Sequence, residues 1–345
     1  MKIIYYIPHS KRNDDGVIKK IRSQIKVWES NGATVTCLWH YKHNKNTDNI
    51  FEVNFNRFLF PFKLIKEINE LKPDFIYLRY TSINLLLMYL LVKFKCIFEI
   101  NGIAHSEKEA TNIFHAKQFI KNLFHYISLK IIARLSHHSF SPTRELKELL
   151  GFSKCDVIPN SIDIEKFSVL RRNKTDTRMK LYFMGTNGFK WHGIHYIEKL
   201  ARLIPEYIFH VVGSEGKNTN NLFYHGYLPK LAYEKILKDI NICIGTMALH
   251  ERGLLEASSL KVREYIANGF PIIINYKDGD EIMAKDWCLN LNIRSTEDLV
   301  HNIEKIKSFC EKNKDKIISN ADRKLASSQE IEGLRYKKFQ KALHL

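Results

Sequence analysis

The sequence predicts an α/β protein built from two doubly wound parallel sheets. Strand and helix patterns alternate through the first half of the chain, and the same alternation restarts near residue 179. A polar, basic stretch at 168–178 separates the two halves, as a linker would. The chain has 345 residues, of which 45% are hydrophobic. That length is too great for one typical domain and sufficient for two cores.

In the first half, apolar runs alternate with longer segments of helical periodicity. Such alternation favours βαβ units and a parallel sheet. The expected strands are 2–7, 33–39, 74–79, 95–100, 137–141 and 155–159, and the expected helices are 17–30, 83–93 and 112–136.

The second half repeats this pattern, and two of its expected strands end in glycine. The expected strands are 179–185, 207–213, 241–246 and 271–275, and the expected helices are 193–204, 231–240 and 259–268. A last helical stretch, from about 320 to 341, follows after the second unit looks complete. Ligands of such sheets bind outside the carboxyl ends of the strands, so we expect the site there.

The segment 256–269 holds the most suggestive chemistry. Glu256 and Glu264 stand on either side of Ser258 and Ser259. If a helix begins near these serines, which are good N-cap residues, its free N–H groups and its dipole attract phosphate. Glu256 could then accept hydrogen bonds from sugar hydroxyls, and Glu264 could accept one from a ribose. A capping region followed by a solvated helix face would explain the same spacing.

Five motifs in chain order resemble glycosyltransferase family 4. The segment 157–167 resembles its interdomain P-N-G-[VI]-D-x-x-x-F signature, with Ser161 in the place of the glycine. Glu256 and Glu264, with the A-x-G-x-P-I run that follows, resemble its Glu-x7-Glu element. Residues 183–201 resemble the family's strand–loop–lysine–helix segment, and residues 16–38 resemble its glycine-led first helix. Residues 222–244 resemble a later helix and the strand after it. The resemblance spans roughly residues 1–280.

The resemblance implies a GT-B fold, in which two Rossmann-like domains face each other across a cleft. It also implies retaining sugar transfer, with the donor held mainly by the C-terminal domain and the acceptor by the N-terminal one. We place the acceptor-binding domain at 1–165 and the donor-binding domain at 166–319. In such proteins the last helix commonly returns to the first domain, so we expect 320–345 to pack back on it.

Carried over position by position, the resemblance assigns Glu256 to the donor sugar, Glu264 to the ribose and Lys190 to the diphosphate. The other expected donor-binding residues are Gly16, Gly185, Thr186, Ser258, Ser259, Leu260 and Lys261. A lysine and a helix N-terminus can stabilise the departing nucleoside diphosphate, so we expect no metal and no other cofactor.

Several positions depart from the family pattern. Thr186 stands where many members carry an arginine, and Lys261 or Arg263 could supply that cation. Many members also carry an N-domain histidine near the reacting sugar. Here Asn101 occupies the corresponding strand end and His105 lies shortly after it, so both are catalytic candidates. A turn before glycine and a solvated loop histidine are the structural explanations.

Two further patterns have structural and functional explanations. Asp278-Gly279-Asp280 resembles the D-x-D metal motif of the other large glycosyltransferase fold, but it follows a late strand, so we expect a polar loop. The stretch 111–144 has no Asp or Glu. A basic amphipathic helix there can lie on an anionic membrane surface, and an ordinary helix packed on its sheet fits equally.

We therefore expect a retaining, hexosyltransferase-type glycosyltransferase. It would use a UDP- or GDP-sugar and a glycan or lipid-linked acceptor in capsule, O-antigen or lipopolysaccharide synthesis. The scattered cysteines favour a cytoplasmic location. The basic stretch 111–144 would allow a peripheral position on the inner face of the cell membrane. A catalytically impaired protein of this fold and a nucleotide-sugar epimerase are the alternatives. The net charge of +17 also fits nucleic-acid binding, but without a known binding module we expect no such partner.

Overall fold

The chain folds into two units, each around its own sheet. The computed structural model describes residues 1–7, 15–39, 50–52, 60–79, 83–102, 115–151, 153–170, 178–186 and 188–343. Unit 1 comprises Met1–Pro159 together with Ser328–Leu345, and unit 2 comprises Asn160–Ser327. Unit 1 thus combines segments from both ends of the chain.

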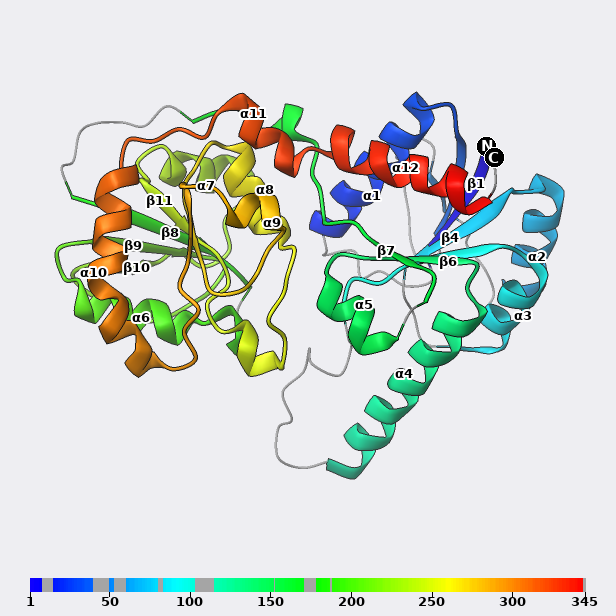
Figure 1. Ribbon diagram of the computed structural model, residues 1–345, viewed down its shortest axis with the longest axis horizontal. Coiled ribbons are helices and arrows are strands. Elements are labelled where there is room, and N and C mark those ends of the chain that lie inside the picture. The colour runs from blue at the N-terminus through cyan, green and yellow to red at the C-terminus, as the bar shows by residue number, and fades with distance from the viewer. Residues whose placement is uncertain are drawn as a thin grey trace. The chain divides into compact units, whose positions relative to one another are not determined.

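Unit 1 is built on a seven-stranded parallel sheet in the order β3-β2-β1-β4-β5-β6-β7 (Figure 1). Its strands are Lys2–Ile7 (β1), Thr34–Trp39 (β2), Ile50–Glu52 (β3), Phe75–Arg79 (β4), Cys96–Glu99 (β5), His138–Ser141 (β6) and Cys155–Val157 (β7). The order reverses between β1 and β4, which makes the sheet doubly wound.

Helices cover both faces of this sheet. They are Asp15–Ser30 (α1), Phe60–Leu71 (α2), Leu85–Lys93 (α3), His115–Leu135 (α4), Arg144–Leu150 (α5) and Ser328–Leu343 (α12). Alternate residues of β1 point to opposite faces. Ile4 and Tyr6 pack in a core with residues of α2, α3 and α4, whereas Ile3 and Tyr5 pack with residues of α1 and α12.

Unit 2 has a six-stranded parallel sheet in the order β10-β9-β8-β11-β12-β13. Its strands are Lys180–Met184 (β8), Ile208–Val212 (β9), Leu222–Tyr224 (β10), Ile242–Ile244 (β11), Ile272–Ile274 (β12) and Cys288–Asn290 (β13). Its helices are Ile194–Leu203 (α6), Lys230–Leu237 (α7), Leu260–Ala267 (α8), Asp280–Met283 (α9), Thr296–Asn313 (α10) and Asn320–Arg323 (α11). The strand order reverses between β8 and β11, so a ligand is expected where these two strands end.

The predicted fold class, two doubly wound parallel sheets, is confirmed. The stretch 320–341 is not one helix, however. The chain runs through α11 and a short 3-10 turn to Ser327, whose extended backbone pairs with Ile162 in unit 2, and α12 begins at Ser328. The backbone leaves helical geometry at Ser327, which is why the stretch divides between the two units.

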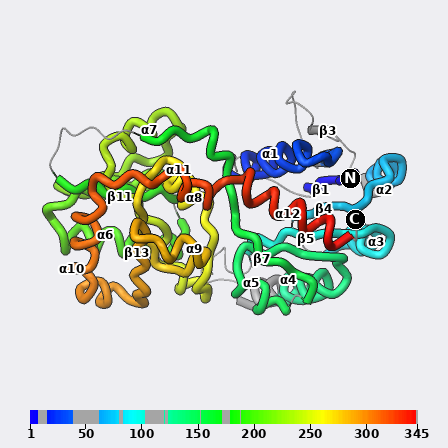
Figure 2. Tube along the Cα trace, turned by 45° about the horizontal axis from the view of Figure 1, so that its top comes forward, coloured from blue at the N-terminus to red at the C-terminus, as the bar shows by residue number. Residues whose placement is uncertain are grey.

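A buried charge cluster attaches α12 to unit 1, where α12 runs alongside α1 (Figure 2). The Arg335 Nε donates to the Glu332 carboxylate at 2.7 Å, and an Arg335 NH2 atom lies 4.0 Å from Glu99. Lys20 of α1 donates to Glu99 as well. Burial alone would raise the pKa of Glu99, but Lys20 and Arg335 hold it well below its usual range. The carboxylate therefore stays ionised inside the core, and two helices supply its counter-charges.

None of the helices in the described ranges has both the length and the apolar run that crossing a bilayer would take. The six cysteines are unpaired thiols, and five of them are buried.

Candidate functional site

The carboxyl end of β8 forms a tightly packed turn at the point where the strand order of unit 2 reverses. Gly185 follows β8 directly, and its N–H donates to the carbonyl of Val212 at 2.9 Å. A Cβ at Gly185 would lie 2.7 Å from the Phe183 ring and 2.8 Å from the His192 ring. Only glycine fits this position, so the backbone after β8 stays close to the packed rings.

His192 and Lys261 lie beside this turn. The His192 Nδ1 lies 3.0 Å from the Thr186 carbonyl oxygen, so Nδ1 carries the proton. Burial, with a smaller contribution from Lys261, lowers the pKa of His192 to about 3, and the ring is therefore neutral at pH 7. The Lys261 Nζ lies 4.4 Å from the centroid of the Phe183 ring. Gly185, His192 and Lys261 thus share Phe183 as a common neighbour.

The Lys261 ammonium is buried and has no hydrogen-bond partner among the described residues, although its stem is partly exposed. Burial lowers the pKa of this amine to about 7. An isolated buried cation is costly unless it meets an anion. Lys261 is also the second residue of α8, where free backbone N–H groups and the helix dipole favour an anion as well. Both features favour a negatively charged ligand at one place.

The loop before α8 is held by a buried arginine. The Arg263 guanidinium donates to both Asp278 oxygens, at 2.9 and 2.5 Å, and both side chains are fully buried. It also donates to the Asn160 carbonyl at 3.0 Å and to the Ser258 Oγ at 2.8 Å. Arg263 therefore cannot supply the cation expected in place of the family arginine, and of the two alternatives only Lys261 remains.

The two expected serines have different roles. Ser259 is the N-cap residue of α8, but its side chain makes no capping hydrogen bond. The Ser258 Oγ instead accepts from the Asn160 N–H at 2.8 Å, and Asn160 Nδ2 donates to the Ser258 carbonyl at 2.5 Å. This ties the interdomain signature to the start of α8, where Leu260 is the first helical residue.

The two glutamates lie on different structural supports. Glu256 is partly buried on an extended segment bonded to Lys277 on both sides: Lys277 N donates to the Leu255 carbonyl at 2.8 Å, and Ala257 N donates to the Lys277 carbonyl at 3.0 Å. Glu264 lies in the second turn of α8, partly buried, where its carboxylate accepts a hydrogen bond from Tyr233. The backbone thus fixes both positions.

Lys190 and Thr186 are exposed. Lys190 begins the 3-10 turn Lys190–His192, which leads into α6 through Gly193. The backbone of Thr186 is engaged by His192, whereas its side chain faces solvent. Lys190 is therefore placed on the surface of the turn, unlike the buried ammonium of Lys261.

The remaining candidates belong to unit 1. Asn101 follows β5, and its Oδ1 accepts from the Lys20 Nζ at 3.2 Å. Gly16 lies in the first turn of α1 rather than in a loop. Lys20, on the same helix as Gly16, contacts Asn101 just after the end of β5. His105 lies outside the described residues.

The D-x-D-like segment is not arranged as a metal site. Asp278 is paired with Arg263, and its Oδ1 also accepts from the Gly279 N–H at 2.7 Å. In the described part of the chain, no three His, Cys, Asp or Glu side chains gather closely enough to hold a metal ion.

Sequence reasoning missed Phe183, His192 and Lys20. His192 precedes Gly193, a helix-leading glycine with φ of 76°, and this position was the one available signal. Phe183 and Lys20 looked like ordinary residues of a core strand and a helix. Their importance follows only from contacts across long sequence separations.

No protein-family model matches the chain, and no curated protein matches it in sequence. Solved structures match it in fold. Sucrose-phosphate synthase from Thermosynechococcus elongatus gives a TM-score of 0.71 at 11% identity, covering 99% of each chain. An alpha-glucosyltransferase in complex with UDP-glucose and abasic-site DNA gives 0.65 at 12%, covering 99% of each chain. The lipopolysaccharide outer core galactosyltransferase WaaB gives 0.62 at 12%, covering 100% of this chain and 99% of that one. The fold is GT-B.

Proposed function

We propose that the protein is a glycosyltransferase that takes a sugar from a nucleotide-sugar donor held by unit 2. The observation that carries this proposal is the buried Lys261 ammonium, which has no hydrogen-bond partner among the described residues and lies at the N-terminus of α8, beside the turn at Gly185. A nucleoside diphosphate supplies the anion that this place lacks. The similar alpha-glucosyltransferase was solved with UDP-glucose, which supports this class of donor.

The proposed chemistry assigns each residue a separate task. Lys261, Lys190 and the N–H groups of α8 stabilise the charge that develops on the departing diphosphate. Glu264 accepts a hydrogen bond from the ribose, and Glu256 accepts hydrogen bonds from the donor sugar. We assign retention of configuration and a role for Asn101 or His105 near the acceptor on the basis of the motif resemblance. Because lysines and the helix N-terminus provide the positive charge, the reaction is proposed to need no metal.

The experiment that tests the donor site is a thermal-shift panel without added metal, using UDP, GDP, ADP, CMP and their common sugar conjugates. A ligand that binds only the folded protein raises its melting temperature by mass action. We expect a clear rise with one nucleoside diphosphate and its sugar conjugate. No rise with any of them would contradict the donor site and favour a catalytically impaired protein of this fold.

Activity then tests the residues. Glu256→Gln and Lys190→Ala are each expected to lower turnover at least tenfold, because each removes an interaction with the donor. Glu281→Gln and Lys238→Ala, at exposed positions elsewhere in unit 2, are the matched controls. Initial rates of sugar release from the donor identified by the panel give the measurement. Unchanged rates in the first two variants would remove both residues from the site.

For the acceptor, we propose a glycan or lipid-linked glycan of the bacterial surface, reached from the cytoplasmic face of the membrane. The likeness to a lipopolysaccharide galactosyltransferase supports this proposal. The surface of α4 supports it further. Ile120, Leu123, Phe124 and Ile127 lie at helical spacing, and between 46% and 66% of each side chain is exposed. Figure 1 shows the first half of α4 extending past the sheet of unit 1.

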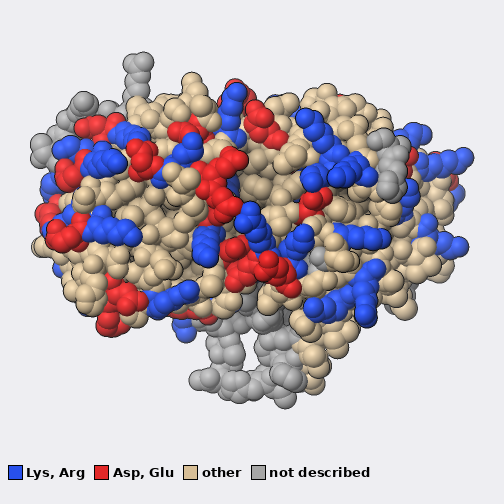
Figure 3. Space-filling view, in the orientation of Figure 1, with Lys and Arg blue, Asp and Glu red and all other residues tan. Residues whose placement is uncertain are grey.

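Charge on the same unit fits an anionic membrane. Figure 3 shows mostly Lys and Arg on the face over the part of unit 1 that carries α2 and α3. Arg134 is exposed near the end of α4, and the whole stretch 111–144 lacks carboxylates. Full burial of an aliphatic or aromatic side chain contributes about 1.5–3 kcal/mol, so the half-buried residues of α4 have roughly 1 kcal/mol each left to gain. We therefore propose that α4 docks on anionic lipid.

This docking predicts a specific loss. Phe124→Ser with Ile127→Ser is expected to weaken sedimentation with phosphatidylglycerol–phosphatidylcholine vesicles at least fivefold, because it removes two anchors. Lys117→Glu with Lys121→Glu should weaken it as well. The control, Leu231→Ser with Val300→Ser, changes two exposed apolar residues of unit 2. Equal sedimentation of all these variants would refute the lipid surface.

A nucleic-acid acceptor is the competing outcome, since the chain carries a net charge of +17 and the similar alpha-glucosyltransferase was solved with DNA. A short duplex added to the thermal-shift panel distinguishes the two. A salt-sensitive rise with the duplex, together with sugar transfer to it, would replace the glycan in this proposal.

A further inference from the structure

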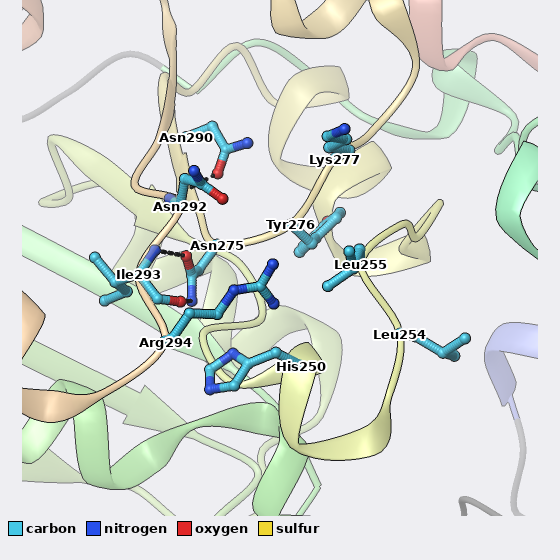
Figure 4. A pocket seen from close by; sticks show the side chains of 10 residues that line it. All are labelled: His250, Leu254, Leu255, Asn275, Tyr276, Lys277, Asn290, Asn292, Ile293 and Arg294. Carbon is cyan, nitrogen blue, oxygen red and sulfur yellow. Dashed lines mark hydrogen bonds between the residues drawn. The ribbon is translucent and has the colours of Figure 1, made fainter.

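A pocket of unit 2, open to solvent, lies where β12 and β13 end (Figure 4). Asn275 and Lys277 follow β12. Asn290 ends β13, and Asn292 and Arg294 follow it. The donor elements identified above, Gly185 and Lys261, do not line this pocket. The pocket is therefore a separate feature of the same sheet edge.

The lining is cationic and amide-rich. Lys277 and Arg294 contribute two positive charges, and none of the described residues that line the pocket is Asp or Glu. Neither side chain has an ion-pair partner in the described ranges. Figure 4 shows the Arg294 guanidinium directed into the space between Asn275 and Leu255. Two exposed cations beside the side-chain amides of Asn290 and Asn292, with no carboxylate in the described lining, favour an oxyanion.

The walls of the pocket are built rigidly. Asn275 Nδ2 donates to the Met247 and Ile293 carbonyls at 2.7 and 2.9 Å, and its Oδ1 accepts from the Ile293 N–H at 2.8 Å. The Arg294 N–H donates at 2.7 Å to Asp298, which closes the capping box of α10. Asn292 has a φ of 53°, in the left-handed region that asparagine tolerates. The backbone on both sides of Arg294 is thus fixed in advance of any ligand.

We propose that this pocket binds an oxyanion, a carboxylate or a phosphate, carried by a sugar. The link to the sugar is Lys277, whose backbone holds the segment of Glu256 on both sides. An anion bound at Lys277, on the side of the pocket next to this segment, would lie beside the residue assigned to the donor sugar. The inference that a sugar carries the anion rests on the proposed function. It makes an acidic or phosphorylated sugar the substrate class.

The test uses the full chain and three probes at constant ionic strength: glucuronate, glucose 1-phosphate and glucose, with inorganic phosphate as a fourth. Backbone amide shifts at Lys277 and Arg294 report binding directly. We expect saturable shifts with one of the anions and none with glucose. Shifts with glucuronate alone identify a carboxylate as the ligand, and shifts with glucose 1-phosphate alone identify a sugar phosphate. If inorganic phosphate binds equally well, the pocket recognises a free anion, and the proposal that a sugar carries the anion is overturned.

Variants separate this pocket from the donor site. Arg294→Gln and Lys277→Gln each leave the backbone intact and are expected to weaken binding of the anion at least tenfold. Arg202→Gln, an exposed arginine of α6, is the matched control. All three should keep the thermal shift with the donor nucleotide. Amide shifts that never saturate, or that persist unchanged in Arg294→Gln, would contradict the anion pocket and leave the proposed donor site unaffected. If the wild type binds the anion but shows no thermal shift with any nucleotide, the donor site is contradicted and the anion pocket stands.

Discussion

Lys261→Met is expected to make the ligand-free protein more stable and, at the same time, to abolish its stabilisation by the donor nucleotide. The ammonium is buried without a hydrogen-bond partner among the described residues, so the folded state carries an uncompensated charge or gives up a proton. Methionine fills similar space over the Phe183 ring without that cost. We expect a gain of roughly 1–3 kcal/mol in the free energy of unfolding.

The pH dependence gives the same prediction a second test. The pKa of Lys261 is lowered from 10.5 to about 7 in the folded state by burial. Between these values the unfolded chain binds more protons than the folded one, so stability rises with pH from about 7 upwards. Lys261→Met should lose this rise. Urea denaturation at pH 7 and pH 9, with and without nucleotide, measures both effects.

The control for this prediction is Lys238→Met, which removes a cation from an exposed position of the same unit. It should change neither the pH slope nor the nucleotide effect. If Lys261→Met behaves like Lys238→Met, the amine is not the anion-binding group, and Lys190 becomes the diphosphate cation.

Arg263→Met is expected to destabilise unit 2 by about 3–5 kcal/mol, since it leaves a fully buried carboxylate without its counter-charge. The Asp278 side chain has no exposed surface and receives two hydrogen bonds from this guanidinium. The same change frees the Ser258 hydroxyl and the Asn160 carbonyl, which position the start of α8. Nucleotide binding should therefore weaken together with stability.

A double variant distinguishes a buried ion pair from simple loss of packing. Arg263→Met with Asp278→Leu removes both charges, and replacement of a whole buried pair is often nearly neutral. We expect the double variant to recover most of the lost stability in urea denaturation, with the transitions of the two units fitted separately. It should not recover nucleotide binding, because Ser258 and Asn160 remain without their donor. A double variant less stable than Arg263→Met would contradict this account.

Periodicity sufficed to predict the fold class because both halves alternate long apolar strands with amphipathic helices. It missed the longer helices α2 and α10. It also missed the strands β10 and β13, whose three residues show no period and whose existence depends on pairing with neighbours. The break at Ser327 was missed for a related reason. A single extended residue is specified by its pairing with Ile162, far away in the sequence.

The residues of the site were predictable where a sequence motif determines the backbone. They were less predictable where the role of a side chain depends on its burial in the folded protein. Gly185 and Ser258 came from motif positions, and both lie at tight contacts. The choice between Lys261 and Arg263 could not be made from their spacing. Asp278 neutralises Arg263 in the core, whereas nothing of opposite charge in the described ranges pairs with Lys261. Only the folded neighbours distinguish the two cations.

The placement of α12 has a consequence for how the protein matures on the ribosome. The strands of unit 1 emerge first, but Glu99 must wait for Arg335, and the aromatic cluster around Trp28 must wait for Phe339. All of unit 2 is translated in the interval. The later-made unit can therefore finish folding before the earlier one, and the apolar face of nascent unit 1 stays uncovered until α12 has been translated. A chaperone that shields this face during elongation would be expected to raise the yield of native protein.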